Sequence, residues 1–156
     1  MLCAMPRRLD TTLESEGAEF LVLGNLLVAG IEATKAYRNF PGFDLYATYP
    51  TEGTTCRIQV KSRFATDYDG GFPIRNFGSD FVVFVALNRG YRSRRRRARA
   101  ADGRRAPDFY VFPTAVVEAA QAPRSTWGKV FLRHMDDADR YRDRWDLIRD
   151  FLRMPT

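Results

Sequence analysis

The N-terminal part of the chain carries the hydrophobic spacing of a buried helix. Thr11 and Glu14 form the capping-box pattern that begins helices, and Gly30 is of the residue type that often ends them. Between these signals apolar residues recur on every turn. The pattern predicts a largely buried helix over residues 13–29.

Shorter runs further along the chain have the spacing of strands. Two alternating runs flank a turn of residues 50–54 that contains proline and glycine, which is the sequence form of a β-hairpin. The run over 81–87 is apolar at every position, as in a central strand covered on both faces. The predicted strands cover residues 31–37, 43–49, 56–63, 81–87, 108–112 and 129–133, with a loop at 66–79.

Helical patterns return toward the C-terminus. Thr114 can cap a short helix to about residue 121, and residues 139–153 form an amphipathic pattern. Its apolar stripe consists of Tyr141, Trp145, Ile148 and Leu152. A helix followed by antiparallel strands and then mixed elements predicts an α/β fold of the mixed α+β kind. With 156 residues, 45% of them hydrophobic, we expect one domain spanning 1–156.

Charge changes this picture because it is concentrated in one segment. Residues 89–105 contain nine of the 25 basic residues, all arginine, and a single acid, Asp102. Leaving this segment out gives 16 basic against 18 acidic residues, so the rest of the chain is slightly acidic. We expect a mobile Arg-rich loop at about 89–107 that neutralises phosphates without reading bases. The alternatives are a solvated insertion and a contact with another polyanion.

Several functional classes find no support in the composition. The chain lacks an uncharged apolar run of about 18 residues and a signal-peptide pattern, so we expect a cytoplasmic protein. Cys3 and Cys56 make neither a disulfide framework nor a metal cluster and are expected to be free thiols. His134 is the single histidine, which argues against a histidine triad or a zinc centre.

The predicted hairpin gathers polar side chains on one of its faces. Strand alternation places Asp44 and Tyr46 on the face that also holds Gln59 and Lys61. Folding about the middle of the turn pairs positions whose numbers sum to about 105, which sets Asp44 near Lys61 and Tyr46 near Gln59.

These groups suit the hydrolysis of a phosphodiester. A carboxylate, an amide oxygen and the backbone carbonyl of Val60 can hold Mg²⁺ (or Mn²⁺), a hard cation that prefers oxygen ligands. Lys61 can orient the nucleophile or stabilise charge that develops on the phosphate. Glu19 on the first helix can add a second carboxylate or hold a metal-bound water, with Glu16 as the fallback.

At these residues the sequence resembles the PD-(D/E)XK nuclease superfamily, in a Gln-x-Lys variant similar to group I intron homing endonucleases and Holliday-junction resolvases. The resemblance covers roughly residues 13–87 and implies a restriction-endonuclease-like core, catalysis by Asp44, Gln59, Lys61 and Glu19, and a DNA substrate. The matching segments are Gly17-Ala18-Glu19-Phe20, Gly42-Phe43-Asp44-Leu45 and Ile58-Gln59-Val60-Lys61-Ser62-Arg63.

Three features depart from the family pattern. Phe43 replaces the proline that names the motif, at a position that supplies no ligand. Gln59 replaces the usual Asp or Glu, which removes one negative charge from the metal site. The family commonly has a helix after the lysine strand, where residues 66–79 have the composition of a loop.

Together these features predict a metal-dependent endonuclease that acts on DNA and works on duplexes as a homodimer. RNA is the alternative substrate. The alternative is a nuclease fold that binds nucleic acid or serves as an adaptor without cutting it. The expected nucleic-acid contacts are Arg63, Arg75, Asn76, Arg92, Arg94, Arg95, Arg96 and Arg97.

Overall fold

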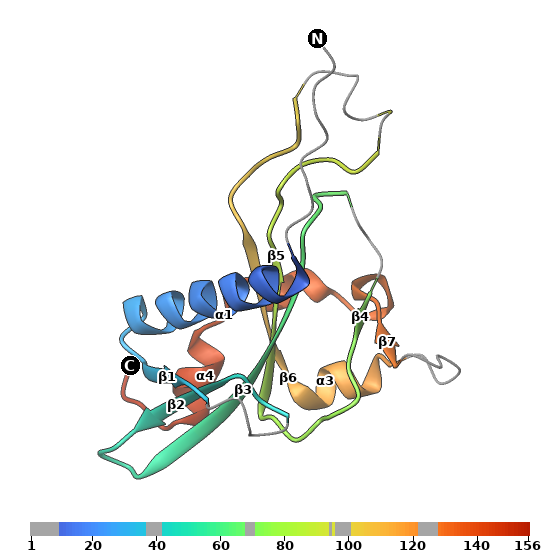
Figure 1. Ribbon diagram of the computed structural model, residues 1–156. Helices are drawn as coiled ribbons and strands as arrows, with labels where there is room; N and C mark the ends of the chain where they lie inside the picture. Colours follow the sequence, from blue (N-terminus) through green and yellow to red (C-terminus); the bar gives the residue numbers. More distant parts are fainter. Residues whose placement is uncertain (1–9, 37–41, 68–70, 94, 96–100, 122–127) are drawn as a thin grey trace.

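A five-stranded sheet forms the centre of the fold (Figure 1). The structure, a computed structural model, describes residues 10–36, 42–67, 71–93, 95, 101–121 and 128–156. The strand order is β1-β2-β3-β5-β6; β3 and β5 run parallel, and the other neighbours run antiparallel. The strands are β1 (Glu32–Lys35), β2 (Leu45–Tyr49), β3 (Thr54–Arg63), β5 (Phe81–Ala86) and β6 (Asp108–Pro113). The predicted mixed α/β class is therefore confirmed, and the strand predicted over 31–37 lies at one edge of the sheet.

Helix α1 (Thr11–Val28) crosses one face of the sheet (Figure 1). Its cap is Asp10, whose side chain accepts a 2.8 Å hydrogen bond from the Thr12 N–H, so the prediction of Thr11 as the cap is wrong by one residue. Asp10 takes the role because its carboxylate and its carbonyl both serve the first turn, the carbonyl accepting from the Glu14 N–H. Gly30 follows the helix with a φ of +76°, a conformation that favours glycine.

Two hydrophobic layers cover the two faces of the sheet. Alternate residues of β5 point into each, so that Val83 lies in the layer with α1 and Val82 in the opposite one. The first layer also includes α4 (Asp146–Phe151), and the second includes α3 (Thr114–Ala119). All six residues of β5 are buried, which confirms the prediction of a central strand.

Residues 71–79 cross the second layer without a helix. Strand β4 (Phe72–Pro73) pairs antiparallel with β7 (Lys129–Val130) in a separate two-stranded sheet. Phe72 and Ile74 are buried there against Val82 and Phe84. The strand expected at 129–133 is thus shorter than predicted, because the 3-10 helix η1 (Leu132–His134) follows it directly.

The helix predicted over 139–153 is broken in two. The 3-10 helix η2 (Ala138–Tyr141) ends before Arg142, which forms a bridge with Tyr110 of β6, and the Asp143 N–H donates to the Phe109 carbonyl at 2.9 Å. This segment therefore pairs with the open edge of the sheet before α4 begins. The predicted apolar stripe is divided, with Tyr141 in the second layer and its other three members in the first.

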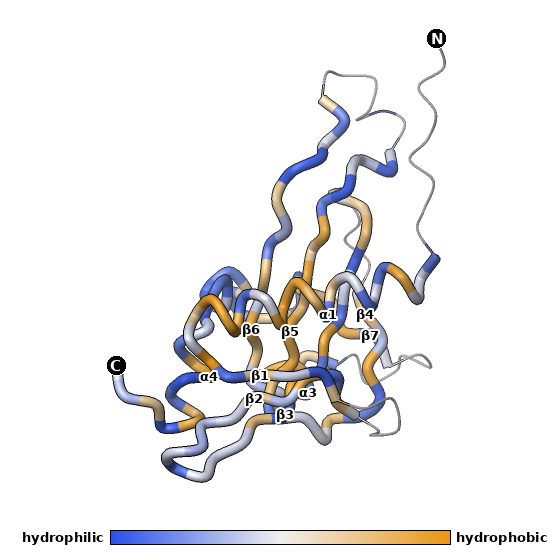
Figure 2. The backbone as a smooth tube through the Cα atoms, turned by 60° about the vertical axis from the view of Figure 1, so that its left-hand side comes forward, coloured by the Kyte–Doolittle hydropathy of each residue, from blue (hydrophilic) through white to orange (hydrophobic). Residues whose placement is uncertain are grey.

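The Arg-rich segment begins and ends as a paired extension rather than as an irregular loop. Arg89 bridges Arg104, and the Tyr91 N–H donates to the Asp102 carbonyl at 2.8 Å. The two legs rise away from the C-terminal end of β5 and are mostly hydrophilic (Figures 1 and 2). We name the legs 88–93 and 101–106 the arginine arm.

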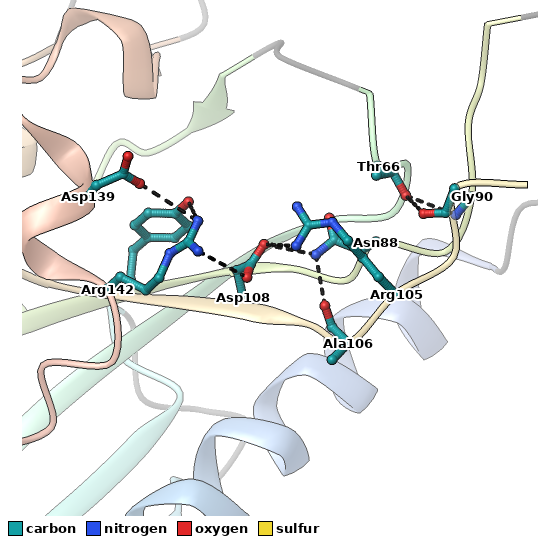
Figure 3. Close-up of polar contacts among 10 residues, drawn as sticks. Thr66, Asn88, Gly90, Arg105, Ala106, Asp108, Asp139 and Arg142 are labelled. Atoms are coloured by element: carbon teal, nitrogen blue, oxygen red, sulfur yellow. Dashed lines mark hydrogen bonds and ion pairs between the residues drawn. The ribbon is translucent and has the colours of Figure 1, made fainter. Parts of the chain in front are cut away.

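A polar cluster fixes the base of the arginine arm (Figure 3). The Asn88 side-chain amide donates to the Ala106 carbonyl and to Asp108, each at 3.0 Å, and Arg105 donates to the same carboxylate at 2.6 Å. Asn88 is fully buried with a φ of +52°. These bonds hold the two legs together where they leave the sheet.

None of the helices in the described ranges is long and apolar enough to cross a membrane.

Candidate active site

The register of the β2–β3 hairpin determines which polar residues meet. Leu45 lies opposite Ile58 and Tyr49 opposite Thr54, so the predicted pairing of Asp44 with Lys61 is wrong by two residues. The reason is that β3 begins at Thr54, which shortens the turn to residues 50–53. A shift of two residues keeps each side chain on its predicted face. Continued by one residue, the register sets Asp44 opposite Gln59.

Asp44 directly precedes β2, at the open end of the hairpin, where the ladder of backbone hydrogen bonds between β2 and β3 stops. Its backbone N–H donates to the Ile58 carbonyl at 2.9 Å, and its side-chain Oδ2 accepts from the Val60 N–H at 2.7 Å. The carboxylate therefore accepts the hydrogen bond that a backbone carbonyl would accept if β2 continued. Since the N–H and C=O of a strand residue face the same neighbour, the Val60 carbonyl is on the Asp44 side of β3.

Gln59 presents an unsatisfied oxygen beside this carboxylate. Its side-chain Oε1 is buried and has no hydrogen-bond partner among the described residues. A buried amide oxygen without a partner is costly, by about 1–3 kcal/mol, unless something absent from the protein chain binds it. The group is thus available to a ligand.

Lys61 follows on the same face of β3, opposite Phe84 of β5. Burial lowers the pKa of its ammonium group, and the charge of Asp44 raises that pKa only in part. In the described part of the chain the Lys61 ammonium forms no hydrogen bond or ion pair of its own.

Glu19 approaches the same place from helix α1. Burial raises the pKa of its carboxyl group, the hydrogen bond from Lys35 lowers it, and the charge of Asp44 raises it further. Lys35 of β1 lies 2.9 Å from the Glu19 Oε2 and also pairs with Glu16. The charge of Asp44 thus acts on both Glu19 and Lys61, and the register of the hairpin sets Gln59 opposite Asp44.

Lys35 is a residue that the sequence pattern did not single out. It lies at the end of β1, within the strand predicted over residues 31–37, where no role was assigned to its charge. The available signal was a lysine in the strand that follows a helix with two acids on one face. Its side chain is 25% exposed, so the ion pairs are partly shielded from water.

The predicted nucleic-acid contacts are distributed over several places. Arg63 is half-buried with its guanidinium 5.8 Å from the centre of the Phe84 ring. Arg75 and Asn76 are exposed, and Asn76 lies against Gly42, where an added Cβ would come within 2.6 Å of its Nδ2. Asn76 is thereby next in space to Gly42, two residues before Asp44.

The arginines of the charged segment divide into two groups. Arg92 is exposed on a leg of the arginine arm, and its backbone N–H donates to Asp67 at 2.6 Å. Arg95 is exposed as well. Arg94, Arg96 and Arg97 lie outside the described residues.

The donor set fits one hard divalent cation. The described residues hold no cluster of three or more His, Cys, Asp or Glu side chains that could bind a metal. One carboxylate, an amide oxygen without a partner and a backbone carbonyl are instead available at the end of β2, and all three are oxygen donors of the kind that Mg²⁺ accepts together with water. Of the two predicted free thiols, Cys56 is buried and free, and Cys3 lies outside the described residues.

Comparison with known proteins places this architecture among nuclease-like folds. The chain is similar to the solved structure of a bacterial homing endonuclease, I-Ssp6803I, with a TM-score of 0.55 and 20% sequence identity over 92% of this chain and 94% of that chain. No protein-family model matches the sequence, and no curated protein does. At this identity the likeness concerns the fold: a central mixed sheet flanked by helices, as in that endonuclease.

Proposed function

We propose that the protein is a metal-dependent endonuclease of the PD-(D/E)XK type that hydrolyses phosphodiester bonds of DNA. Asp44, Gln59 and the Val60 carbonyl hold Mg²⁺ or Mn²⁺, Lys61 assists the attack, and Glu19 supports the site. The observation that carries the proposal is the buried, partnerless Gln59 oxygen beside a carboxylate already fixed to the backbone of β3.

The side chains divide the work of hydrolysis among them. One water is consumed: its oxygen forms a bond to phosphorus, the bond to the leaving oxygen breaks, and that oxygen takes up a proton. A Mg²⁺ ion held by these residues would supply polarisation of the phosphoryl oxygen and acidification of a water molecule. Lys61 is suited to orient that water or to stabilise negative charge on the phosphate, because its ammonium is half-buried and has no competing partner among the described residues.

The arginine arm supports a nucleic-acid substrate. It begins at Asn88, four residues along the chain from Phe84, which is the partner of Lys61 in the sheet. At about 3.3 Å per residue the base of the arm is roughly 13 Å from the level of Lys61, which is within the width of a duplex. Exposed arginines there bind phosphates, and a duplex cut on both strands requires a second copy of the chain.

A nicking assay tests the proposal. Supercoiled and branched DNA are incubated with Mg²⁺ or Mn²⁺ and the wild type, Lys61→Ala or the control Lys129→Ala. We expect metal-dependent nicking that Lys61→Ala reduces by roughly 100-fold or more and Lys129→Ala leaves unchanged. The enzyme proposal is refuted if all three proteins bind DNA equally and in a salt-sensitive way but none cleaves it. That result favours the inactive nucleic-acid-binding module.

A further inference from the structure

Lys35 connects the end of β1 to helix α1. Its ammonium lies 2.9 Å from Glu19, pairs with Glu16 and is 4.6 Å from the centre of the Phe20 ring. The Glu19 and Lys35 side chains are 18% and 25% exposed, so the pair is largely withdrawn from water. The Glu19 carboxylate is thus beside a resident cation before any metal arrives.

The charges around the site are nearly balanced without a second metal. Three carboxylates, those of Glu16, Glu19 and Asp44, face two ammonium groups, those of Lys35 and Lys61, which leaves a single negative charge. One divalent ion at Asp44 reverses that sign. A second ion would add two more positive charges beside two ammonium groups.

We propose that Lys35 occupies the place of a second divalent ion, so that the site binds one metal at Asp44 and holds Glu19 through Lys35. The inference rests on the proposed function and goes beyond it in fixing the number of ions. Lys35 is then a positioning residue, acting on the site through Glu19.

Geometry and electrostatics support this assignment. In two-metal sites the ions are about 3.5–4 Å apart and share carboxylates. A second ion beside Asp44 would need the Glu19 carboxylate, and to reach it would have to displace the Lys35 ammonium from Glu19. The displaced ammonium would remain partly buried and close to a doubly charged ion, which repels it.

The number of bound ions is the measurement that tests the inference. Mn²⁺ is titrated in the absence of DNA into the wild type, Lys35→Met and Lys35→Arg, with calorimetry and electron paramagnetic resonance to count ions. We expect one ion for the wild type, two for Lys35→Met and one for Lys35→Arg, which keeps the charge. The double variant Lys35→Met/Glu19→Gln is expected to return to one ion, locating the second ion at Glu19.

A further variant avoids dependence on the folding of Lys35→Met. Glu19→Gln alone is expected to retain one ion with an affinity within about threefold of the wild type, since Glu19 does not bind it directly; a two-ion site would lose one. Two ions in the wild type, or one ion in a folded Lys35→Met protein, overturns the inference and leaves the nuclease proposal standing. No ion in the wild type refutes the metal site itself, and the inference with it.

Discussion

Gln59 and Lys61 are polar side chains held in a half-buried position that a purely structural strand would fill with apolar residues. The Gln59 oxygen lacks a partner among the described residues, and burial lowers the pKa of Lys61. Such unfavourable placements persist where function requires them. Replacing these polar side chains is therefore expected to change the stability of the protein and its activity in opposite directions.

Replacing Lys61 by methionine is expected to stabilise the protein while abolishing nicking. Methionine fills the same volume without a buried charge, and we expect a rise in Tm of roughly 2–4 °C at pH 7, the size that about 1 kcal/mol produces in a domain of this length. Calorimetry of both proteins measures the difference.

The same comparison has a predicted pH dependence. Because the pKa of Lys61 is lower in the folded than in the unfolded chain, the unfolded chain binds more protons between the lowered pKa and 10.5, and wild-type stability gains from rising pH in that window. The advantage of Lys61→Met should therefore narrow as the pH rises toward 10.5. An advantage that is constant with pH argues against a buried charge as its cause.

Gln59→Glu is expected to tighten divalent-ion binding. The change restores a second carboxylate beside Asp44, which attracts the ion more strongly, by roughly tenfold in Kd. Without metal the two carboxylates repel each other, so the Tm of the metal-free variant is expected to fall and to recover in Mg²⁺. Gln59→Leu is the matched control, with no gain in metal affinity.

At the residue scale, the sequence was sufficient to predict the members of the site but not their exact neighbours. Alternation along each strand assigned Asp44, Gln59 and Lys61 to one face, and this depends on local geometry alone. The pairing of Asp44 with Gln59 depends on where the turn closes, which the composition of residues 50–54 leaves open. Lys35 could not be predicted from local pattern because its partners lie on a helix 16 and 19 residues earlier in the chain.

Among the elements, helix α1 combines a buried face with an unusual outer one. Ala18, Val22 and Leu26 are fully buried, whereas the outer face carries two glycines, Gly17 and Gly24, that have nothing within 4 Å of an added Cβ. Glycine in a helix interior is unfavourable because it loses more backbone freedom than alanine on folding. The outer face is thus open to stabilising substitutions.

Gly17→Ala/Gly24→Ala is expected to raise the free energy of unfolding. Each change contributes about 0.5–1 kcal/mol, since neither meets a steric obstacle. Gly42→Ala is the contrasting control: its φ is +97° and its Cβ would clash with Asn76, so it is expected to destabilise. Urea denaturation of the variants compares them, and an unchanged midpoint for the double variant contradicts the expectation.

The elements that sequence patterns predicted best are those whose partners are close in the chain. The first helix and the hairpin follow from local periodicity, and β5 from its unbroken apolar run. The helix was expected to be largely buried, which is wrong: it buries one face only, and Phe20 and Leu27 are more than half exposed. The C-terminal helix was mispredicted because Arg142 and Asp143 pair with residues 109–110 of β6, a contact that helical periodicity does not include. A distant strand edge outweighed the local helical preference there.

In the molecule as a whole, the concentrated positive charge and the candidate site lie at the same end of the sheet. The arginine arm leaves the C-terminal end of β5, and the rest of the chain is slightly acidic. The segment was expected to be a mobile loop; its two described legs pair with each other, with Asn88 and Asp108 at the base. Composition predicted the charge but not this pairing, since the anchoring residues lie outside the arginine run.

Removing arginines from the arm is expected to weaken DNA binding in a salt-dependent way. For Arg92→Ser/Arg104→Ser the magnitude of the negative slope of log K against log salt concentration should decrease by about 0.9 for each phosphate that the arm no longer neutralises. Arg140→Ser/Arg144→Ser removes the same charge elsewhere and should leave the slope nearly unchanged. Fluorescence anisotropy at several salt concentrations measures both, and equal slopes in the two variants exclude a specific role for the arm.

The bond between the Asp44 Oδ2 and the Val60 N–H has an evolutionary consequence. An asparagine at position 44 retains an acceptor for that N–H, so a descendant that replaces this aspartate keeps its architecture while forfeiting the anionic ligand. Under the proposed function, cleaving and non-cleaving lineages are then separated by one conservative substitution. Selection for nucleic-acid binding alone can therefore act on this fold without any change in its architecture.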